Sequence, residues 1–432
     1  MFSMKYISLT ICLLLIINGC CLVATAANNL TPSSIKLSLT QKVSEMRVTW
    51  YTPSKGSSPI VLFGTSPFVA NNSIYEQSVV ATIEDLISVD WSGYTNTALL
   101  SGLLPLTTYF YAVGEKNEQL FSDVYNFTTA AADYSENVDP FSIVVYGDMG
   151  IYGGSHRTLA RIVDRLDDFK FAIHVGDIAY ADVTKASKDV GNETVWNEFL
   201  DMINPVSSHI PYMVCPGNHD IFFINFGIYR RTFNMPAPSL EDSWYSFDYN
   251  GVHFVSYSTE HLILPLSPQH DWLENDLKTY RMKNPGGWIV LYAHRPFYCS
   301  TSWSYCVKDD YKVMLQDSLE YLLFEYNVDL FIGGHAHSYE RTLPVYAGNV
   351  ANYGTYDAPK ATVHLVVGTG GCQEGPDPGW QQPAPIWSTG ERLLDVGYGV
   401  VSFANNTHLQ YQFINTTSNT VRDEFWLTKG FW

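Results

Sequence analysis

The sequence predicts a two-domain protein in which an all-β sandwich precedes a larger α/β domain with β-sheets flanked by helices. Two observations lead to this prediction. Residues 28–133 contain short strand-like runs and no helical pattern, whereas from residue 140 onwards apolar strands alternate with segments of helical spacing. The chain has 432 residues, 46% of them hydrophobic, so each domain can bury a core of its own.

Residues 1–26 have the features of a secretory signal peptide. Lys5 supplies the basic start, a mostly apolar stretch covers residues 7–17, and residues 24–26 (Ala-Thr-Ala) fit the small-residue cleavage pattern. An uncleaved membrane anchor is the alternative, but the apolar run is short for a bilayer. We therefore expect a protein that leaves the membrane after cleavage, with secretion and a lysosome-like lumen both open as destinations.

The cysteines and the glycosylation sequons agree with an oxidising compartment. Beyond the signal peptide the sequence retains Cys215, Cys299, Cys306 and Cys372. A Cys299–Cys306 disulfide would close a short loop and is favoured, which leaves Cys215 to pair with Cys372. Six Asn-x-Ser/Thr sequons predict a glycoprotein. They lie at Asn29, Asn71, Asn126, Asn192, Asn405 and Asn415.

The charge balance restricts the partners of the protein. The formal net charge is −18, and only 16% of the residues are charged. An acidic protein of this kind is a poor candidate for binding nucleic acid or an anionic membrane through bulk electrostatics. We expect neither as a partner.

The first domain is predicted from its strands. The runs KLSLTQ, MRVTWY, PIVLFG and TYFYAVG are separated by Pro, Gly, Ser and Asn, as in a small antiparallel sandwich. The run GLLPLTTYFYAV resembles a late strand of a fibronectin type III domain. Trp50, Tyr109 and Tyr111 are accordingly expected in the core rather than in a binding site. A linker over residues 130–140 follows.

The second domain opens with a strand, a helix and a strand. FSIVVYGD and FAIHVGD are apolar strands, and SHRTLARIVDRLDD between them has helical spacing. This order predicts parallel pairing and a β-α-β-α-β core covered on both faces. The predicted buried face of the helix consists of Leu159, Ile162, Val163 and Leu166. Three strand histidines are predicted to be core residues with hydrogen-bonded rings, namely His174, His253 and His364.

Five apolar strands each end in side chains that can bind a metal. In chain order they are Asp148, then Asp177 and Tyr180, then Asn218 and His219, then His294, and finally His335 and His337. Ligands of open α/β sheets bind beyond the carboxyl ends of the strands, so these residues can converge on one crevice. Neighbouring glycines permit the sharp turns that this requires, at Gly147, Gly176, Gly217 and Gly334.

The types of side chain indicate the kind of metal. Two aspartates, a phenol, an amide and three histidines favour iron, manganese or zinc in octahedral-like coordination over a thiolate zinc site. Seven ligands exceed the needs of one small cation, but two metals that share a bridging carboxylate would use all of them. A phenol has a pKa near 10, so Tyr180 would bind at low pH only to a strongly acidic cation, and Fe(III) fits best. Either aspartate alone could instead be a turn residue.

These five blocks carry a family resemblance. GDMG, GDIAY, GNHD, the AH of LYAHRP, and GHAH match, in order, the signature of the metallophosphoesterase superfamily, and the tyrosine three residues after the second aspartate is similar to the purple acid phosphatase branch. HRPFYCS and HSYERTLPVY are similar to animal-type members. The resemblance covers nearly the whole chain beyond the signal peptide and implies a sandwich domain at 28–133 and a catalytic domain at 140–432.

The resemblance implies a role for each ligand. It assigns Fe(III) to Asp148, Tyr180 and His337. It assigns a divalent metal, which is Fe(II), Zn or Mn, to Asn218, His294 and His335. Asp177 would bridge the two metals, and His219 would stay off the metals and face the substrate.

The activity that the resemblance implies is that of a secreted acid phosphatase. It would hydrolyse small phosphate monoesters with a metal-bound hydroxide, while His219 contacts the phosphoryl group or protonates the leaving oxygen. A secreted metal-dependent phosphodiesterase or nucleotidase of the same superfamily is one alternative, against which Tyr180 argues. A non-catalytic secreted binding glycoprotein is another, against which the complete ligand set argues. A homo-oligomer is left open.

One stretch departs from the plant members of the family. They carry a pair of histidines shortly after the fourth-block ligand, where these contact phosphate, but here the stretch reads RPFYCSTSWSYC. Arg295, Trp303 and Tyr305 are the candidates for lining the pocket in their place. The substrate preference of the plant enzymes therefore does not carry over.

Overall fold

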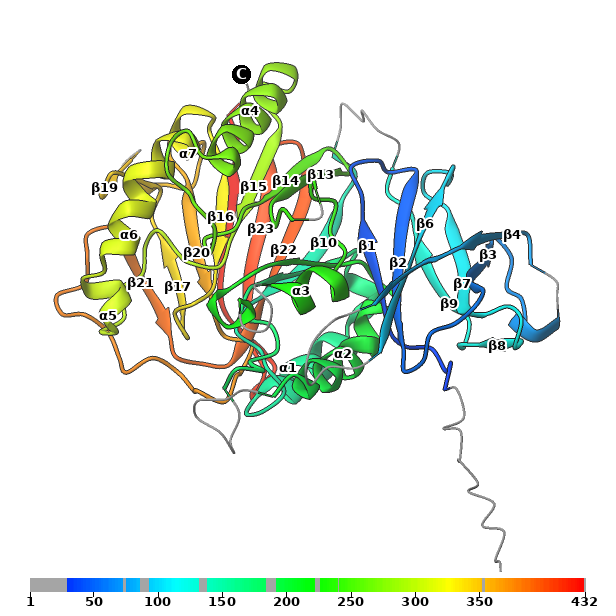
Figure 1. Cartoon of the computed structure of the whole chain (residues 1–432). Coiled ribbons are helices and arrows are strands. Elements are labelled where there is room, and N and C mark those ends of the chain that lie inside the picture. Colours follow the sequence, from blue (N-terminus) through cyan, green and yellow to red (C-terminus); the bar gives the residue numbers. More distant parts are fainter. Residues whose placement is uncertain are drawn as a thin grey trace, which may run out of the picture.

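The structure is a computed structural model that describes residues 29–72, 75–85, 93–131, 138–183, 192–221, 226–239, 241–351 and 354–430. The predicted signal peptide and the middle of the predicted linker lie outside these residues. Figure 1 shows a β-sandwich at one end of the molecule and a larger α/β region at the other.

Two antiparallel sheets form the sandwich. One has the order β1-β2-β6-β5, and in the other, ordered β4-β3-β7-β8, strand β9 also pairs with β7. The strands are β1 (Ser33–Leu39), β2 (Glu45–Thr52), β3 (Pro59–Gly64), β4 (Gln77–Val80), β5 (Thr82–Asp85), β6 (Tyr94–Ser101), β7 (Thr108–Glu115), β8 (Leu120–Phe121) and β9 (Tyr125–Thr128), with a short 3₁₀ turn at Ala70–Asn72. Trp50, Tyr109 and Tyr111 are buried, as predicted. The Tyr109 hydroxyl accepts a hydrogen bond from the Leu104 backbone N–H at 3.0 Å, which ties the β6–β7 connection to the core.

The first sheet of the α/β region contains the predicted parallel core. Its order is β12-β11-β10-β22-β23-β24, in which β10, β11 and β12 are parallel and the other pairs antiparallel. The strands are β10 (Phe141–Tyr146), β11 (Ala172–Val175), β12 (Tyr212–Cys215), β22 (Gly397–Asn405), β23 (His408–Asn415) and β24 (Thr420–Thr428). Helices α1 (Ser155–Val163) and α2 (Thr194–Ser207) connect the parallel strands. The predicted β-α-β-α-β core is confirmed.

A second mixed sheet packs against the first. Its order is β13-β14-β15-β16-β20-β17-β21, with β14, β15, β16 and β20 parallel. The strands are β13 (Tyr245–Tyr249), β14 (Val252–Ser256), β15 (Trp288–Tyr292), β16 (Leu330–Gly333), β17 (Tyr339–Thr342), β20 (Val363–Val367) and β21 (Ser388–Leu393), and β18 (Val345–Tyr346) pairs with β19 (Asn349–Val350) as a separate hairpin.

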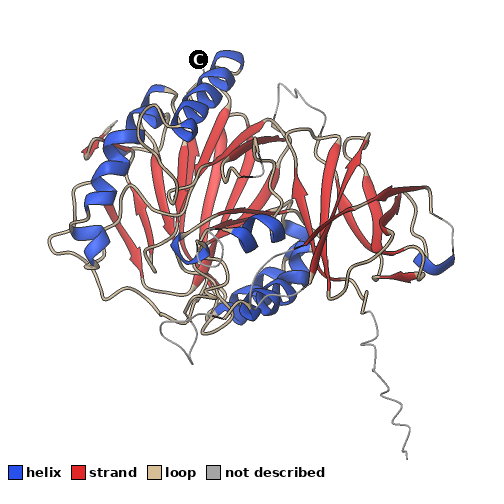
Figure 2. Ribbon diagram, viewed as in Figure 1, coloured by secondary structure: helices blue, strands red, loops and turns tan. Residues whose placement is uncertain are grey.

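Helices cover the outer faces of both sheets (Figure 2). Alternate residues of β10 explain why its sequence is largely apolar: Val145 packs between the two sheets, whereas Val144 packs against the helix side. The remaining helical segments are the 3₁₀ turns Leu166–Asp168 and Asn218–Asp220, α3 (Gly227–Thr232), α4 (Pro268–Lys283), α5 (Ser304–Val307), α6 (Asp310–Leu315), a π-helical turn at Gln316–Glu320 and α7 (Tyr321–Glu325).

The sandwich is joined to the α/β region through α2. The Ile35 backbone N–H donates to Asn204 Oδ1 at 2.8 Å, and Ser207 Oγ donates to the Ile35 carbonyl at 2.7 Å. The Tyr111 hydroxyl donates to the Ser208 carbonyl at 2.7 Å. Strand β1 therefore docks on the helix that precedes β12, one of the strands that carry the predicted ligands.

The structure corrects three local predictions. Cys299 and Cys306 form the favoured disulfide, but Cys215 and Cys372 are both free, because Cys215 packs between the two sheets whereas Cys372 lies beside His337. Val163 is 38% exposed, since α1 turns only Leu159 and Ile162 of the predicted face fully inward.

The third correction concerns the strand histidines. The rings of His174 and His253 are hydrogen-bonded, but neither ring nitrogen of His364 has a partner. The His364 ring packs among Phe297, Tyr298 and Phe331.

A buried ion pair joins the two sheets and gives a stability prediction. Arg341 of β17 and Asp423 of β24 make two hydrogen bonds of 2.8 and 2.9 Å, and both side chains are nearly inaccessible. We expect Asp423→Asn to lower the free energy of unfolding by about 3 to 5 kcal/mol, because it leaves the guanidinium buried without a counter-charge. Urea unfolding of wild type and variant measures this difference.

The exposed pair Arg422–Asp395 is the matched control. Asp395→Asn should cost less than about 1 kcal/mol, because water screens an exposed pair. Equal losses for Asp423→Asn and Asp395→Asn would contradict the assignment.

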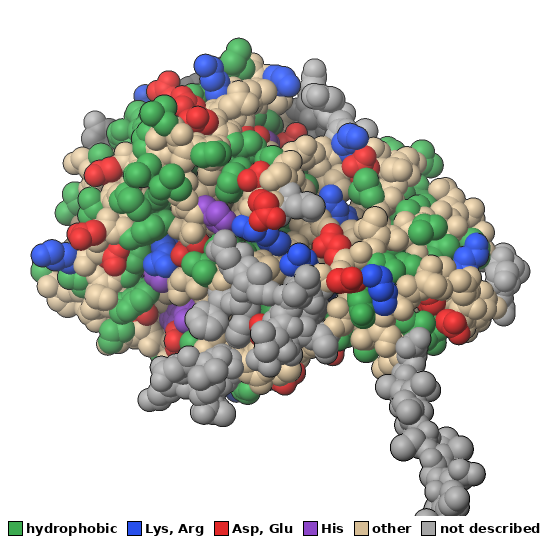
Figure 3. Space-filling view, viewed as in Figure 1, with side chains coloured by type: hydrophobic (Ala, Val, Ile, Leu, Met, Phe, Trp, Pro, Cys, Tyr) green, Lys and Arg blue, Asp and Glu red, His purple; other side chains and the backbone are tan. Residues whose placement is uncertain are grey.

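The surface carries charges of both signs. On the face shown in Figure 3, Lys and Arg side chains are scattered among Asp and Glu rather than gathered in one stripe. In the part of the chain that the structure describes, no helix has the length and apolar character needed to cross a membrane.

Candidate metal centre

The predicted ligands follow the carboxyl ends of parallel strands. Asp148 comes after β10, Asp177 after β11 and Asn218 after β12 in one sheet, while His294 and His335 come after β15 and β16 in the other. The carboxyl ends of parallel strands meet at one edge of a sheet, and the two sheets pack face to face. The five loops therefore meet at a shared crevice.

The backbone of this crevice is unusual. Four of the predicted ligands have positive φ, namely Asp148 (57°), Asp177 (50°), Tyr180 (53°) and His335 (66°). A residue other than glycine held in this left-handed region costs on the order of 1 kcal/mol or more, and such residues cluster at functional sites. The surrounding structure must stabilise these conformations, which indicates that they aim the side chains at a common target.

Two of the neighbouring glycines are needed for different reasons. Gly176 has a φ of 81°, a backbone conformation that residues with a side chain rarely adopt. Gly217 has an ordinary extended backbone, but a Cβ there would lie 2.2 Å from Asp177 Oδ1. The sharp-turn explanation therefore holds for Gly176, whereas Gly217 makes room for the carboxylate.

Asp148, Tyr180 and His337 form one group of donors. The Tyr180 hydroxyl lies 3.2 Å from Asp148 Oδ1 and 3.0 Å from His337 Nε2, and the latter is 3.4 Å from Asp148 Oδ1. His337 Nδ1 lies 2.8 Å from the Gly375 carbonyl, to which it donates its proton. In the neutral ring, Nε2 therefore directs a lone pair at the phenol and the carboxylate.

Asp177, Asn218, His294 and His335 form a second group. His294 Nε2 lies 3.0 Å from Asp177 Oδ2, 3.2 Å from Asn218 Oδ1 and 3.1 Å from His335 Nδ1. His294 Nδ1 lies 3.0 Å from the Val175 carbonyl and donates to it, so Nε2 of the neutral ring carries no proton. Carboxylate, amide and imidazole acceptors thus face one another.

His219 stands beside both groups. Its backbone N–H donates to Asp177 Oδ1 at 2.8 Å, and its ring packs over the Tyr180 ring with centroids 4.4 Å apart. Its Nδ1 contacts Asp182 Oδ2 at 2.7 Å, while Nε2 lies 3.9 Å from Glu374 Oε2. Asp182 therefore orients the ring and leaves Nε2 facing the crevice.

The electrostatics of the crevice follow from burial and from these contacts. Burial opposes the protonated form of His219, but Asp177 and Asp182 outweigh it and raise the pKa of His219 to about 10. Burial, together with the negative charges of Asp148 and Asp177, raises the pKa of Tyr180 well above its ordinary value. Burial and the charges of His294 and Arg295 lower the pKa of His335, which keeps that ring neutral, as a metal ligand must be.

The donor set fits metal cations. Donor atoms of Asp177, His294 and His335 lie within 4.8 Å of one another. The acceptors that converge on His294 Nε2 need a positive partner between them, which is either an extra proton or a metal ion. The His335 backbone N–H donates to Asp148 Oδ2 at 3.0 Å, which joins the second group to the first. All seven predicted ligands are brought together.

Sequence reasoning missed several residues of the crevice. Asp182 follows Tyr180 in GDIAYAD, and Asp220 closes GNHD, where its carboxylate accepts the backbone N–H groups of Ile178 and Gly217 at 3.0 and 2.8 Å. Cys372 and Glu374 form a further donor group with His337. The only sequence signal for Cys372 and Glu374 is that they follow the apolar strand VHLVV, just as each predicted ligand follows an apolar strand.

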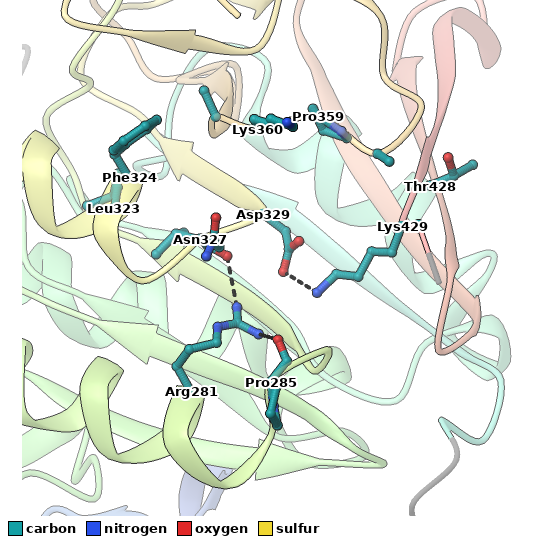
Figure 4. A pocket seen from close by; sticks show the side chains of 14 residues that line it. Arg281, Pro285, Leu323, Phe324, Asn327, Asp329, Pro359, Lys360, Thr428 and Lys429 are labelled. Carbon is teal, nitrogen blue, oxygen red and sulfur yellow. Dashed lines mark hydrogen bonds and ion pairs between the residues drawn. The ribbon is translucent and has the colours of Figure 1, made fainter. Parts of the chain in front are cut away.

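A well-formed pocket of about 160 Å³ lies elsewhere (Figure 4). Its residue Asp329 precedes β16, so the pocket is at the opposite end of this strand from His335. Three of its four charged side chains already have partners: Lys429 pairs with Asp329 at 2.9 Å, and Arg281 donates to the carbonyls of Pro285 and Asn327. The chemistry indicated by the sequence is therefore in the crevice and not in this pocket.

A parallel β-α-β-α-β core with oxygen and nitrogen donors at its carboxyl edge defines a metallophosphoesterase, and family comparisons agree. Residues 141–339 match the calcineurin-like phosphoesterases. Residues 32–129 match the purple acid phosphatase N-terminal domain, and residues 361–424 match the family described as iron/zinc purple acid phosphatase-like protein C.

Individual relatives make the family specific. Acid phosphatase type 7 of Homo sapiens is 31% identical over 97% of this chain and 95% of its own length. Purple acid phosphatase 18 of Arabidopsis thaliana is 30% identical over 92% of this chain and 84% of its own length. The chain belongs to the purple acid phosphatase family. The structure of a purple acid phosphatase from yellow lupin seeds shares the fold, with a TM-score of 0.81 and 24% identity over 93% of this chain and 75% of that one.

Proposed function

We propose that the protein is a secreted acid phosphatase that hydrolyses phosphate monoesters at a binuclear centre formed by the crevice. The observation that supports this most strongly is the convergence of seven donors. In it the Nδ1 atoms of His294 and His337 contact the carbonyls of Val175 and Gly375, and the two Nε2 atoms face carboxylate, phenol and amide oxygens. In this proposal the sandwich occupies residues 28–133 and the catalytic domain residues 140–432.

The two donor groups would hold different metals. Asp148, Tyr180 and His337 suit Fe(III), because only a strongly acidic cation would ionise a phenol whose pKa burial and Asp148 have raised. Asn218, His294 and His335 suit a divalent ion, which is Fe(II), Zn or Mn, and Asp177 would bridge. When bound, such a pair neutralises the phosphoryl oxygens and supplies a hydroxide nucleophile by lowering the pKa of water.

The protein's own side chains position the ester. His219 is held at Nδ1 by Asp182, and its raised pKa keeps it protonated in acid, so Nε2 is a donor that faces the crevice. From there it can donate to a phosphoryl oxygen or to the leaving oxygen. Asp220 accepts backbone N–H groups on both sides of the crevice and thereby holds the loops after β11 and β12 together.

Secretion and glycosylation belong to the same proposal. Five of the six sequon asparagines are exposed, namely Asn29, Asn71, Asn126, Asn192 and Asn405. Asn415 is only 7% exposed, and its Oδ1 accepts the backbone N–H groups of Thr417 and Ser418. We therefore expect glycans at the five exposed sites and none at Asn415.

Metal removal tests the proposal. Hydrolysis of p-nitrophenyl phosphate at acid pH should disappear after chelation and return on adding iron and zinc, whereas His294→Ala should not recover, because it lacks a central donor of the second group. A fully metal-loaded wild type that is as inert as this variant would favour the binding-glycoprotein alternative. Turnover of bis(p-nitrophenyl) phosphate alone would favour the phosphodiesterase.

A further inference from the structure

The pocket of about 160 Å³ in Figure 4 lies where four segments of the α/β region meet. These segments are the end of α4, the turn from α7 to β16, the stretch that leads into β20 and the end of β24. Part of the lining is apolar and consists of Leu323, Phe324, Val328 and Pro359. An apolar cavity of about 150 Å³ is large enough to bind benzene. The pocket therefore has room for one ring or one branched apolar group.

The charges around this pocket are not balanced. Three basic side chains line it, namely Arg281, Lys360 and Lys429, against one acidic side chain, Asp329. The chain as a whole has a formal net charge of −18, so an excess of positive charge in one pocket runs against the average of the protein. Because low-dielectric walls concentrate the field of such charges, the pocket should attract an anion.

Arg281 contributes charge but no free hydrogen-bond donor. Its guanidinium donates to five backbone carbonyls, those of Asn284, Pro285, Gly287, Tyr326 and Asn327, at 2.8 to 3.2 Å. In the part of the chain that the structure describes it has no carboxylate partner, so its positive charge is not neutralised. Lys429 is also occupied, because its Nζ contacts Asp329 and the carbonyls of Gly286 and Gly287.

The mutual effect of these two cations supports an excess of positive charge. Burial lowers the pKa of Lys429, the contact with Asp329 opposes this, and the charge of Arg281 lowers the pKa further. One carboxylate therefore does not offset both cations. A bound anion would.

Two polar side chains of the lining are left to contact a ligand. Lys360 and Asn327 are both exposed at the pocket, and neither side chain has a hydrogen bond or an ion pair among the residues that the structure describes. An ammonium group and an amide N–H can donate to the two oxygens of one carboxylate.

We propose that this pocket binds a small organic monocarboxylate, with its carboxylate at Lys360 and Asn327 and its apolar body against Leu323 and Phe324. The site is separate from the metal centre, since Asp329 and His335 lie at opposite ends of β16. The inference therefore does not depend on the proposed phosphatase function.

Three small ligands test the site. Calorimetry on the iron- and zinc-loaded protein would compare benzoate with benzamide, which has the ring without the charge, and with acetate, which has the charge without the ring. Benzoate should bind more tightly than either. Lys360→Gln should weaken benzoate binding roughly fivefold, the order expected for one hydrogen bond to a charged group, and leave benzamide binding unchanged. Lys360→Arg should retain most of the benzoate affinity, because it keeps the charge.

Lys116→Gln is the matched control, since Lys116 is exposed in the sandwich, in the turn after β7, and the substitution changes the net charge equally. It should leave benzoate binding unchanged. Benzoate that binds no better than benzamide, or equal weakening by Lys360→Gln and Lys116→Gln, would overturn the site. Displacement of benzoate by inorganic phosphate would place it at the metal centre and also overturn the inference.

Discussion

Replacement of Asp177 by Asn is expected to lower kcat/KM for p-nitrophenyl phosphate roughly a thousandfold, since metal stabilisation of the transition state is worth several kcal/mol. The amide keeps the size of the side chain, and its oxygen can still accept the His219 backbone N–H. It loses the negative charge and the second acceptor oxygen, which lies 3.0 Å from His294 Nε2. Loss of the proposed bridge should therefore remove metal without unfolding the protein.

Metal content and activity must be measured on the same preparation. Asp164→Asn is the matched control, because Asp164 lies at the end of α1 with most of its side chain in solvent. It should retain both metal and activity. If Asp177→Asn kept two metals per chain and an activity close to that of wild type, Asp177 would not be the bridge.

Replacement of Tyr180 by Phe is expected to abolish the visible absorption of the iron-loaded protein. A phenolate bound to Fe(III) absorbs visible light, and the variant lacks only the oxygen that would make this bond. The remaining ring can still pack on the ring of His219, so the crevice should keep its shape. A spectrum recorded together with iron analysis separates loss of colour from loss of metal.

Tyr146→Phe makes the same chemical change in a control position. The Tyr146 hydroxyl is buried and donates to the Tyr212 hydroxyl at 2.7 Å, outside the two donor groups. This variant should keep the wild-type spectrum. A visible band that survived in Tyr180→Phe, or a wild type that binds iron and stays colourless, would rule out Tyr180 as an iron ligand.

Much of the candidate site was predictable because its signal is local. Each ligand follows an apolar strand within a few residues, as Asp148 follows FSIVVYG, and strand order then brings such residues to one edge. Two of the three missed carboxylates differ in this respect, whereas the third, Asp220, lies inside the GNHD block. Asp182 and Glu374 lie beyond the five blocks, and only their approach to His219 and His337 distinguishes them from ordinary loop residues.

The buried pair Arg341–Asp423 could not be predicted for a related reason. Each residue lies in a strand of a different sheet, and the sequence has no pattern that relates β17 to β24. The predicted disulfide between Cys215 and Cys372 was wrong. Four cysteines in an oxidising compartment favour two disulfides, but only the short Cys299–Cys306 loop has its partners close together.

The sequence by itself determined the order of sandwich and α/β region, the parallel core and the seven candidate ligands, because hydrophobic periodicity and strand-terminal side chains are properties of short segments. Only the tertiary structure decided which ring nitrogens face the crevice, that Asp182 orients His219, and that Trp303 stands against His335. These features depend on distances between loops that are remote in sequence, and such distances are set by how the two sheets pack.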